Sequence, residues 1–127
     1  MSYYAQTSGT HQTNSSSPVP IPGLGFQIPQ GVKDNIIVIL DVPNPYAQGN
    51  NFPGGWFGIA VNGKIQPAYA SFTYGVQVPQ SFNRMPTTLV VSVPLGGAPQ
   101  TVQAMWSGIR GSTVIIDSPA TLSGLLG

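Results

Sequence analysis

Short apolar runs, each closed by glycine or proline, constrain the fold of this chain more than any other feature. From Val19 onward the runs are rich in β-branched residues, and no window shows the 3.6-residue stripe of a capped amphipathic helix. About eight short strands at such spacing predict an all-β sandwich or jelly roll. The expected strands are 21–26, 36–40, 57–61, 69–78, 87–93, 101–106, 112–116 and 120–125.

Three local patterns sharpen this expectation. Residues 36–40 (IIVIL) are apolar at every position, which predicts a central strand buried on both faces. Prolines break the run at 21–26, which indicates an edge strand. Asn62-Gly63 follows an apolar strand and is the strongest short signal for a β-hairpin.

The 127 residues fit one domain. We expect this domain to span residues 19–127. Residues 1–18 are polar and lack apolar periodicity, so we expect a flexible N-terminal tail. The chain shows no internal repeat of the kind that small propeller or trefoil lectins require.

Charged residues are scarce, at 6% of the chain with a net charge of +1. This balance argues against a nucleic-acid partner, and no basic run or long apolar run predicts membrane insertion. The sequence begins without the features of a classical signal peptide, so a cytoplasmic location and non-classical export both stay open. So uncharged a surface favours association with other copies, and we expect a homo-oligomer.

Few side chains could perform catalysis. The chain has no glutamate and no cysteine, its three aspartates are Asp34, Asp41 and Asp117, and its one histidine, His11, lies in the expected tail. Neither a nucleophilic triad nor paired carboxylates can be assembled convincingly from this set. Asp41 and Asp117 follow expected strands, where they can bond backbone N–H groups or pair with an arginine. We therefore expect no enzyme, no metal site and no cofactor.

A small uncharged ligand suits the remaining polar and aromatic residues better. Residues 41–57 form an expected loop rich in aromatics, amides and glycine, and they include Tyr46 and Trp56 as candidate ring platforms. Packing is the preferred role for Phe52 and Phe57. Arg84 and Arg110 lie beside aromatic and hydroxyl-rich segments, and a guanidinium fork matches adjacent sugar hydroxyls. A structural pairing with an aspartate remains the alternative for each arginine.

Six segments taken together resemble a known family. They are residues 38–43 (VILDVP), 45–47 (PYA), 49–54 (GNNFPG), 72–74 (FTY), 84–86 (RMP) and 110–112 (RGS). In this order they are similar to the N-terminal domain of the Burkholderia superlectin family. The similarity covers roughly residues 21 to 126 and does not extend to the tail before residue 19.

The resemblance implies a tumour-necrosis-factor-like jelly roll that assembles as a homotrimer and binds fucosides, without calcium, between neighbouring protomers. The family's sugar-contact positions fall on Tyr46, Trp56, Thr73, Tyr74, Ser81, Phe82, Arg84 and Arg110. Trp56 stands where the family has tyrosine, and Phe82 stands where it has threonine. We therefore expect a lectin for fucosylated or similar neutral glycans.

Two other classes of function remain in view. A structural or adhesive trimeric module would share the fold and use the aromatic residues for packing. An enzyme acting on glycans is disfavoured because the chain has no glutamate.

Overall fold

The computed structural model describes residues 2–126 and consists of strands and connecting segments over that range. Within these residues, no helix is long and apolar enough to cross a membrane. The strands are β1 (Ser2–Gln6), β2 (His11–Thr13), β3 (Val19–Ile28), β4 (Asn35–Val42), β5 (Tyr46–Gln48), β6 (Gly54–Val61), β7 (Lys64–Thr73), β8 (Thr87–Pro94), β9 (Gln100–Ile109), β10 (Thr113–Ile116) and β11 (Thr121–Leu126).

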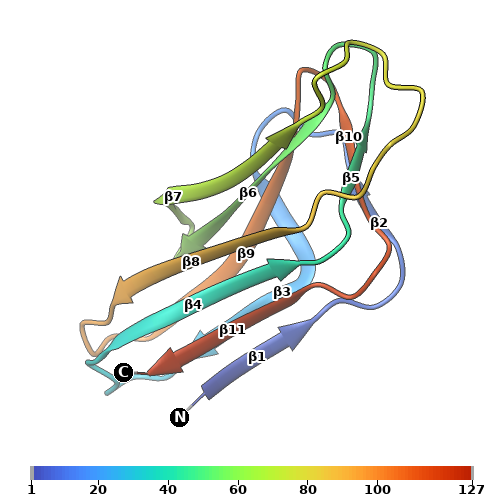
Figure 1. The fold of residues 1–127 in the computed structure, drawn as a ribbon. Helices are drawn as coiled ribbons and strands as arrows, with labels where there is room; N and C mark the ends of the chain where they lie inside the picture. The colour runs from blue at the N-terminus through green and yellow to red at the C-terminus, as the bar shows by residue number, and fades with distance from the viewer. Residues whose placement is uncertain (1, 127) are drawn as a thin grey trace.

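The strands form three antiparallel sheets (Figure 1). The front sheet has the order β1-β11-β4-β8, and the back sheet has the order β3-β9-β6-β7. A smaller end sheet, β2-β10-β5, lies at the end of the molecule away from the chain termini. Because the chain passes repeatedly between the front and back sheets, the topology is that of a jelly roll. The all-β jelly roll predicted from the sequence is confirmed.

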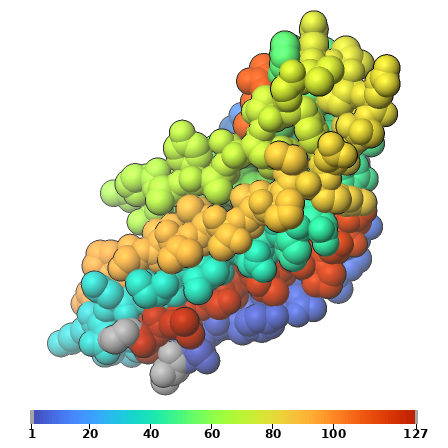
Figure 2. Space-filling view, in the orientation of Figure 1, coloured from blue at the N-terminus to red at the C-terminus, as the bar shows by residue number. Residues whose placement is uncertain are grey.

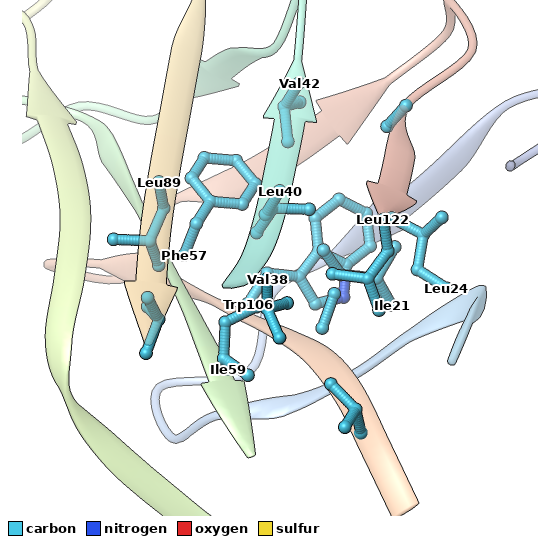
Figure 3. Packing of buried hydrophobic residues seen from close by; sticks show 14 of the residues in the cluster. Ile21, Leu24, Val38, Leu40, Val42, Phe57, Ile59, Leu89, Trp106 and Leu122 are labelled. Carbon is cyan, nitrogen blue, oxygen red and sulfur yellow. The ribbon is translucent and has the colours of Figure 1, made fainter. Parts of the chain in front are cut away.

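The hydrophobic core lies between the front and back sheets (Figure 3). Val38, Leu40 and Leu122 point inward from the front sheet. Phe57 and Trp106 meet them from the back sheet and are almost completely buried. Burial of such large apolar side chains is the main source of stability in a chain without disulfides.

The predicted turn at Asn62-Gly63 is confirmed. It joins β6 to β7, and its two residues have φ angles of 51° and 81°. Positive φ at both positions is what a two-residue turn requires to match the twist of its flanking strands. The proline-broken strand β3 lies at the edge of the back sheet, as predicted, and its pairing with β9 shifts register between Pro20 and Gly25.

β4 is a central strand, as predicted, but the expectation that both of its faces are buried is wrong. Ile36, Val38 and Leu40 point into the core, whereas Ile37 and Ile39 are only partly buried on the outer face. A jelly roll covers one face of each sheet with the opposite sheet, so alternate residues of β4 remain on the outside. In the described residues, no second sheet covers the apolar side chains at those outer positions.

The N-terminal segment differs from the flexible tail expected for residues 1–18. Ser2–Gln6 pairs with β11 as the edge strand of the front sheet, and His11–Thr13 pairs with β10. Thr7 closes the connection, since its N–H donates to the carbonyl of Ala120 and its hydroxyl accepts from the Ala120 N–H, each at 2.9 Å. These backbone hydrogen bonds do not depend on apolar periodicity, which is why composition failed to reveal the strands.

Candidate functional site

A long loop, residues 74–86, joins β7 to β8 and projects at the end of the molecule that carries the end sheet (Figure 2). The sequence predicted a strand continuing to residue 78, but β7 ends at Thr73. Tyr74 anchors the loop. Its hydroxyl donates to the carbonyl of Asn83 at 2.6 Å and accepts from the N–H of Ala47 at 3.3 Å. Candidate residues Ser81, Phe82 and Arg84 therefore lie on a loop that is tied back to β5.

Arg84 is held in one orientation by three neighbours. Its Nη1 and Nη2 donate to the two carboxylate oxygens of Asp117 at 2.6 and 2.9 Å. Nη1 also donates to the carbonyl of Asn44 at 3.1 Å, and the guanidinium carbon lies 4.3 Å from the centre of the Tyr46 ring. The pairing with an aspartate that the sequence left open for Arg84 is therefore present. Hydrogen bonding to the Asp117 carboxylate raises the pKa of Arg84 further, so the group stays charged.

The Asp117 pairing leaves a second edge of the Arg84 guanidinium open. A guanidinium has five N–H donors, and Asp117 and Asn44 take three of those of Arg84. Within residues 2–126, the Nε–H and one Nη2–H have no acceptor, and these two donors share the side edge of the planar group. An edge with two parallel donors can bind two neighbouring hydroxyl oxygens.

Two further candidates lie beside Arg84. Tyr74 is nearly buried, and Phe82 packs edge-on against it with ring centres 6.2 Å apart. Burial raises the pKa of Tyr74, and the hydrogen bond from Ala47 offsets part of that rise. Tyr46, Tyr74, Phe82 and Arg84 are named here the Arg84 group. Ser81 is exposed on the same loop.

Arg110 is held by backbone carbonyls instead of a carboxylate. Its Nε donates to the carbonyls of Asn51 and Phe52 at 3.0 and 3.1 Å, and its Nη2 donates to Phe52 at 2.5 Å. Here the side edge is occupied, and the end edge formed by Nη1 and the second Nη2–H has no acceptor in the described chain. Arg110 and Phe52 both have left-handed backbones, with φ angles of 53° and 49°. Such strain in non-glycine residues is concentrated at functional sites.

Trp56 lies on β6, not in the loop that the sequence predicted for residues 41–57, because β5 and the start of β6 occupy part of that segment. Its neighbour Phe57 points into the core, so the Trp56 indole lies on the outer face of the back sheet. Thr73 pairs with Gly54, and Gly54 pairs with the residue that precedes Arg110. Trp56 and Thr73 thus lie on this face near the end of β9, where the turn that carries Arg110 begins, and the three residues are named here the Arg110 group.

The eight candidates therefore divide into two groups, with Ser81 on the loop beside the first. Thr73 and Tyr74 are adjacent in sequence, so the groups adjoin at the end of β7. The resemblance implies a site between protomers, and that expectation stays a prediction.

Sequence reasoning missed one aromatic residue that lies next to the Arg110 group without belonging to it. Tyr69 stacks on Trp56 with ring centres 6.0 Å apart. Its position was assigned to the start of a loosely alternating strand, although Tyr69, Ser71 and Thr73 alternate on the outer face of β7. The alternation of these residues, together with the Asn62-Gly63 hairpin that pairs β6 with β7, could have indicated that Tyr69 lies near Trp56. Asp117 was recognised as a possible arginine partner, but its choice of Arg84 depended on the fold.

Two other features of the described chain bear on ligand chemistry. No three His, Cys, Asp or Glu residues cluster in residues 2–126. An open hollow of about 340 Å³ lies where β3 and β9 separate at the register shift, lined by Gly23, Gly25, Phe26, Gln27, Thr101 and Gln103. None of the eight candidate residues lines it.

The chain matches one known protein family over most of its length. A family model described as Bc2l-C, N-terminal domain, matches residues 4–125. The match includes most of the segment before residue 19, which the sequence resemblance had left out. No curated protein sequence matches the chain at a significant level.

Some solved structures are similar to this chain at low identity. The CBM36-1 domain of a multidomain xylanase, from the hindgut metagenome of Trinervitermes trinervoides, has 14% identity and a TM-score of 0.47, covering 100% of this chain and 99% of that one. A carbohydrate-binding module CBM36 in complex with calcium and xylotriose has 9% identity and a TM-score of 0.42, covering 91% and 98%. Eiger TNF from S. frugiperda has 9% identity and a TM-score of 0.47, covering 99% and 92%. Likeness at this level carries no argument about a ligand.

Proposed function

Since the chain belongs to the Bc2l-C N-terminal domain family, we propose that it is a lectin for fucosylated or similar neutral glycans, with sites between the protomers of a homotrimer. Membership of this family supports sugar binding and a non-enzymatic role. The observation that carries the proposal is the pair of guanidinium groups. Arg84 and Arg110 each keep one two-donor edge open, and the Arg84 guanidinium lies 4.3 Å from the centre of the Tyr46 ring.

The charge around Arg84 favours a neutral ligand. Asp117 offsets the charge of Arg84 in a two-point ion pair, so this group attracts anions weakly. The open Nε–Nη2 edge still forms charge-assisted hydrogen bonds, which are stronger than neutral ones. Fucose presents a methyl group beside a rim of hydroxyls. The rings of Tyr46 and Trp56 suit the apolar part of such a sugar, and the arginine edges suit its hydroxyls.

The candidate residues fall into two adjoining groups, and the family resemblance implies a site between protomers. On this proposal, the Arg84 group of one protomer meets the Arg110 group of its neighbour, and each seam of the trimer holds one sugar. Three equivalent sites would raise the avidity for a dense glycan surface when their spacing matches it.

The outer face of the front sheet is the surface proposed to bury on assembly (Figure 2). Leu125 lies opposite Ile37 in the strand register, and Val90 lies opposite Ile39. Leu125 and Val90 are 48% and 58% exposed. Among the outward-facing residues of β4, β8 and β11, Asp41 is the charged one, and its carboxylate accepts a hydrogen bond from the Thr88 hydroxyl at 3.1 Å. An exposed apolar face across adjacent strands is typical of a protein–protein interface.

Titration calorimetry with methyl fucoside, after a survey on a glycan array, tests the proposal. Arg84→Ala and Arg110→Ala are each expected to weaken binding about 100-fold or more, because each removes up to two charge-assisted hydrogen bonds. Lys64→Ala removes an exposed charge elsewhere and is the matched control. Chelation of divalent cations is expected to leave binding unchanged. Full binding by both arginine variants, as intact trimers, would contradict the site assignment.

Mixing the two variants tests whether the site is shared between chains. In trimers co-assembled from Arg84→Ala and Arg110→Ala chains, a seam between unlike protomers can unite an intact Arg84 with an intact Arg110. Restored binding in the mixture, absent in either variant alone, is the expected result. If both arginines of a site came from one chain, mixing would restore nothing.

A structural or adhesive module is the alternative function. The burial of Tyr74 and its two hydrogen bonds favour it, since this residue already has a packing role. A stable trimer that stays silent across neutral and charged glycans would support this alternative. A negative hydrolysis assay on fucosylated oligosaccharides would exclude glycosidase activity.

A further inference from the structure

Two aromatic rings lie together on the outer face of the back sheet, next to the Arg110 group. The rings of Trp56 and Tyr69 have centres 6.0 Å apart and planes inclined by 28°. Tyr69 is 59% exposed, and Trp56 is partly exposed. The two rings together present apolar surface to solvent on this face.

Gly58 shapes this pair of rings. It lies opposite Tyr69 in the pairing of β6 with β7, and a Cβ built at position 58 would overlap the Trp56 indole at Cη2. The indole therefore lies across the glycine, close to the sheet surface. A ring in that position presents its open face outward, as a stacking platform does.

Hydroxyl groups flank the rings on the same face. Ser71 lies opposite Trp56 on β7, and Thr73 follows two residues later. Both residues are exposed. Two residues along a strand span about 7 Å, so Thr73 and the Arg110 turn lie roughly one sugar unit beyond the rings. The β6 and β7 positions between Arg110 and the rings, residues 54–58 and 69–73, carry no charged side chain.

We infer that Trp56 and Tyr69 form a second subsite, which stacks the sugar unit attached to the fucose, and that Tyr69 determines specificity for that unit. The inference rests on the proposed lectin function and extends it from a monosaccharide to a disaccharide or longer glycan. The C–H face of a pyranose matches the paired rings, and its hydroxyls match Ser71 and Thr73. A charged sugar would find no oppositely charged side chain at residues 54–58 or 69–73.

The test compares methyl fucoside with a fucosyl-galactose disaccharide by titration calorimetry. We expect the wild-type chain to prefer the disaccharide. Tyr69→Ala should weaken disaccharide binding about threefold to tenfold and leave methyl fucoside within twofold. Tyr69→Phe keeps the ring and should keep the preference. Gly58→Ala, which displaces the Trp56 indole, should weaken the binding of both sugars, because the same indole is proposed to contact the fucose.

Tryptophan fluorescence supplies a second readout, because Trp106 is buried and Trp56 is the exposed tryptophan. The disaccharide should shift the emission of the wild type more than methyl fucoside does. An unchanged ratio of the two affinities in Tyr69→Ala, with methyl fucoside still bound, would overturn the second subsite alone. If the wild type bound neither sugar, the proposed function would fall and this inference with it.

Discussion

Arg84 and Arg110 are held in opposite ways. Arg84 stands on a long loop, and a side-chain carboxylate at Asp117 grips the end of its guanidinium. Arg110 stands in a tight turn with a left-handed backbone, and main-chain carbonyls grip the side of its guanidinium. The first arrangement depends on one side-chain partner and cancels its own charge. The second depends on the path of the backbone, and no carboxylate in residues 2–126 forms an ion pair with it.

The two halves of the proposed site are therefore sensitive to different kinds of substitution. The Arg110 turn tolerates little change in its backbone, because Gly108 packs directly against the main chain of Ser112. The 74–86 loop has more room, since a Cβ at Gly75 would meet nothing within 4 Å. A side chain added at a glycine packed against the backbone, such as Gly108, should therefore disturb the Arg110 turn. Around Arg84, loss of a partner side chain such as Asp117 should have the larger effect.

The largest expected effect comes from Gly108→Ala. The added methyl group would overlap the carbonyl of Ser112, whose hydroxyl also accepts a hydrogen bond from the N–H of Gly54 at 3.0 Å. We expect a loss of about 2–3 kcal/mol in the free energy of unfolding, measured with urea. Gly75→Ala is the matched control and should change stability by less than about 0.5 kcal/mol. Equal losses in the two variants would remove the contrast between the regions.

Asp117→Asn should have an intermediate effect, on binding more than on stability. Without the carboxylate, the Arg84 guanidinium loses its two-point grip, and we expect methyl fucoside affinity to fall about tenfold by calorimetry. Stability should change by less than about 1 kcal/mol, because both partners are partly exposed, at 44% and 29%. Affinity within twofold of wild type would show that Asp117 does not position Arg84.

The smallest effect is expected at alkaline pH, through Tyr74. Burial raises the pKa of this phenol above the 10.0 of an unfolded chain, so the folded protein keeps the proton to higher pH. The resulting stability is complete below pH 10 and declines as the pH rises through the folded pKa, by at most about 1.4 kcal/mol per pH unit. Tyr74→Phe should flatten this decline in urea titrations at increasing pH. An identical slope in both proteins would contradict the assignment.

The fold followed from the sequence wherever the pattern of side chains reports on burial. Apolar runs predicted most strands, and Asn62-Gly63 predicted a hairpin, because these patterns reflect the local conformation of the backbone. The strand at Ser2–Gln6 was not predicted, because it is stabilised by pairing with β11, which is distant in sequence. Pairing between the two ends of a chain leaves no local trace in composition.

The candidate site was only partly predictable from the sequence. Residue types indicated arginines, aromatics and hydroxyls for a neutral ligand, and the family resemblance supplied their positions. The partition into two groups could not be foreseen, because it depends on how β6, β7 and the 74–86 loop are arranged in space. Tyr69 was missed for the same reason, since its contact with Trp56 arises from the register of β6 against β7.

The pairing of β1 with β11 bears on how the domain responds to mechanical load. Ser2 lies opposite Leu125, and both chain ends emerge at the same end of the front sheet (Figure 1). Tension applied between the two ends would open the hydrogen bonds of this strand pair one after another, as a zipper opens. A pull exerted through bound ligand at the far end would instead be spread across several strands at once. The protein should thus unfold at a lower force when it is stretched between its termini than when it is pulled through the loops at the far end.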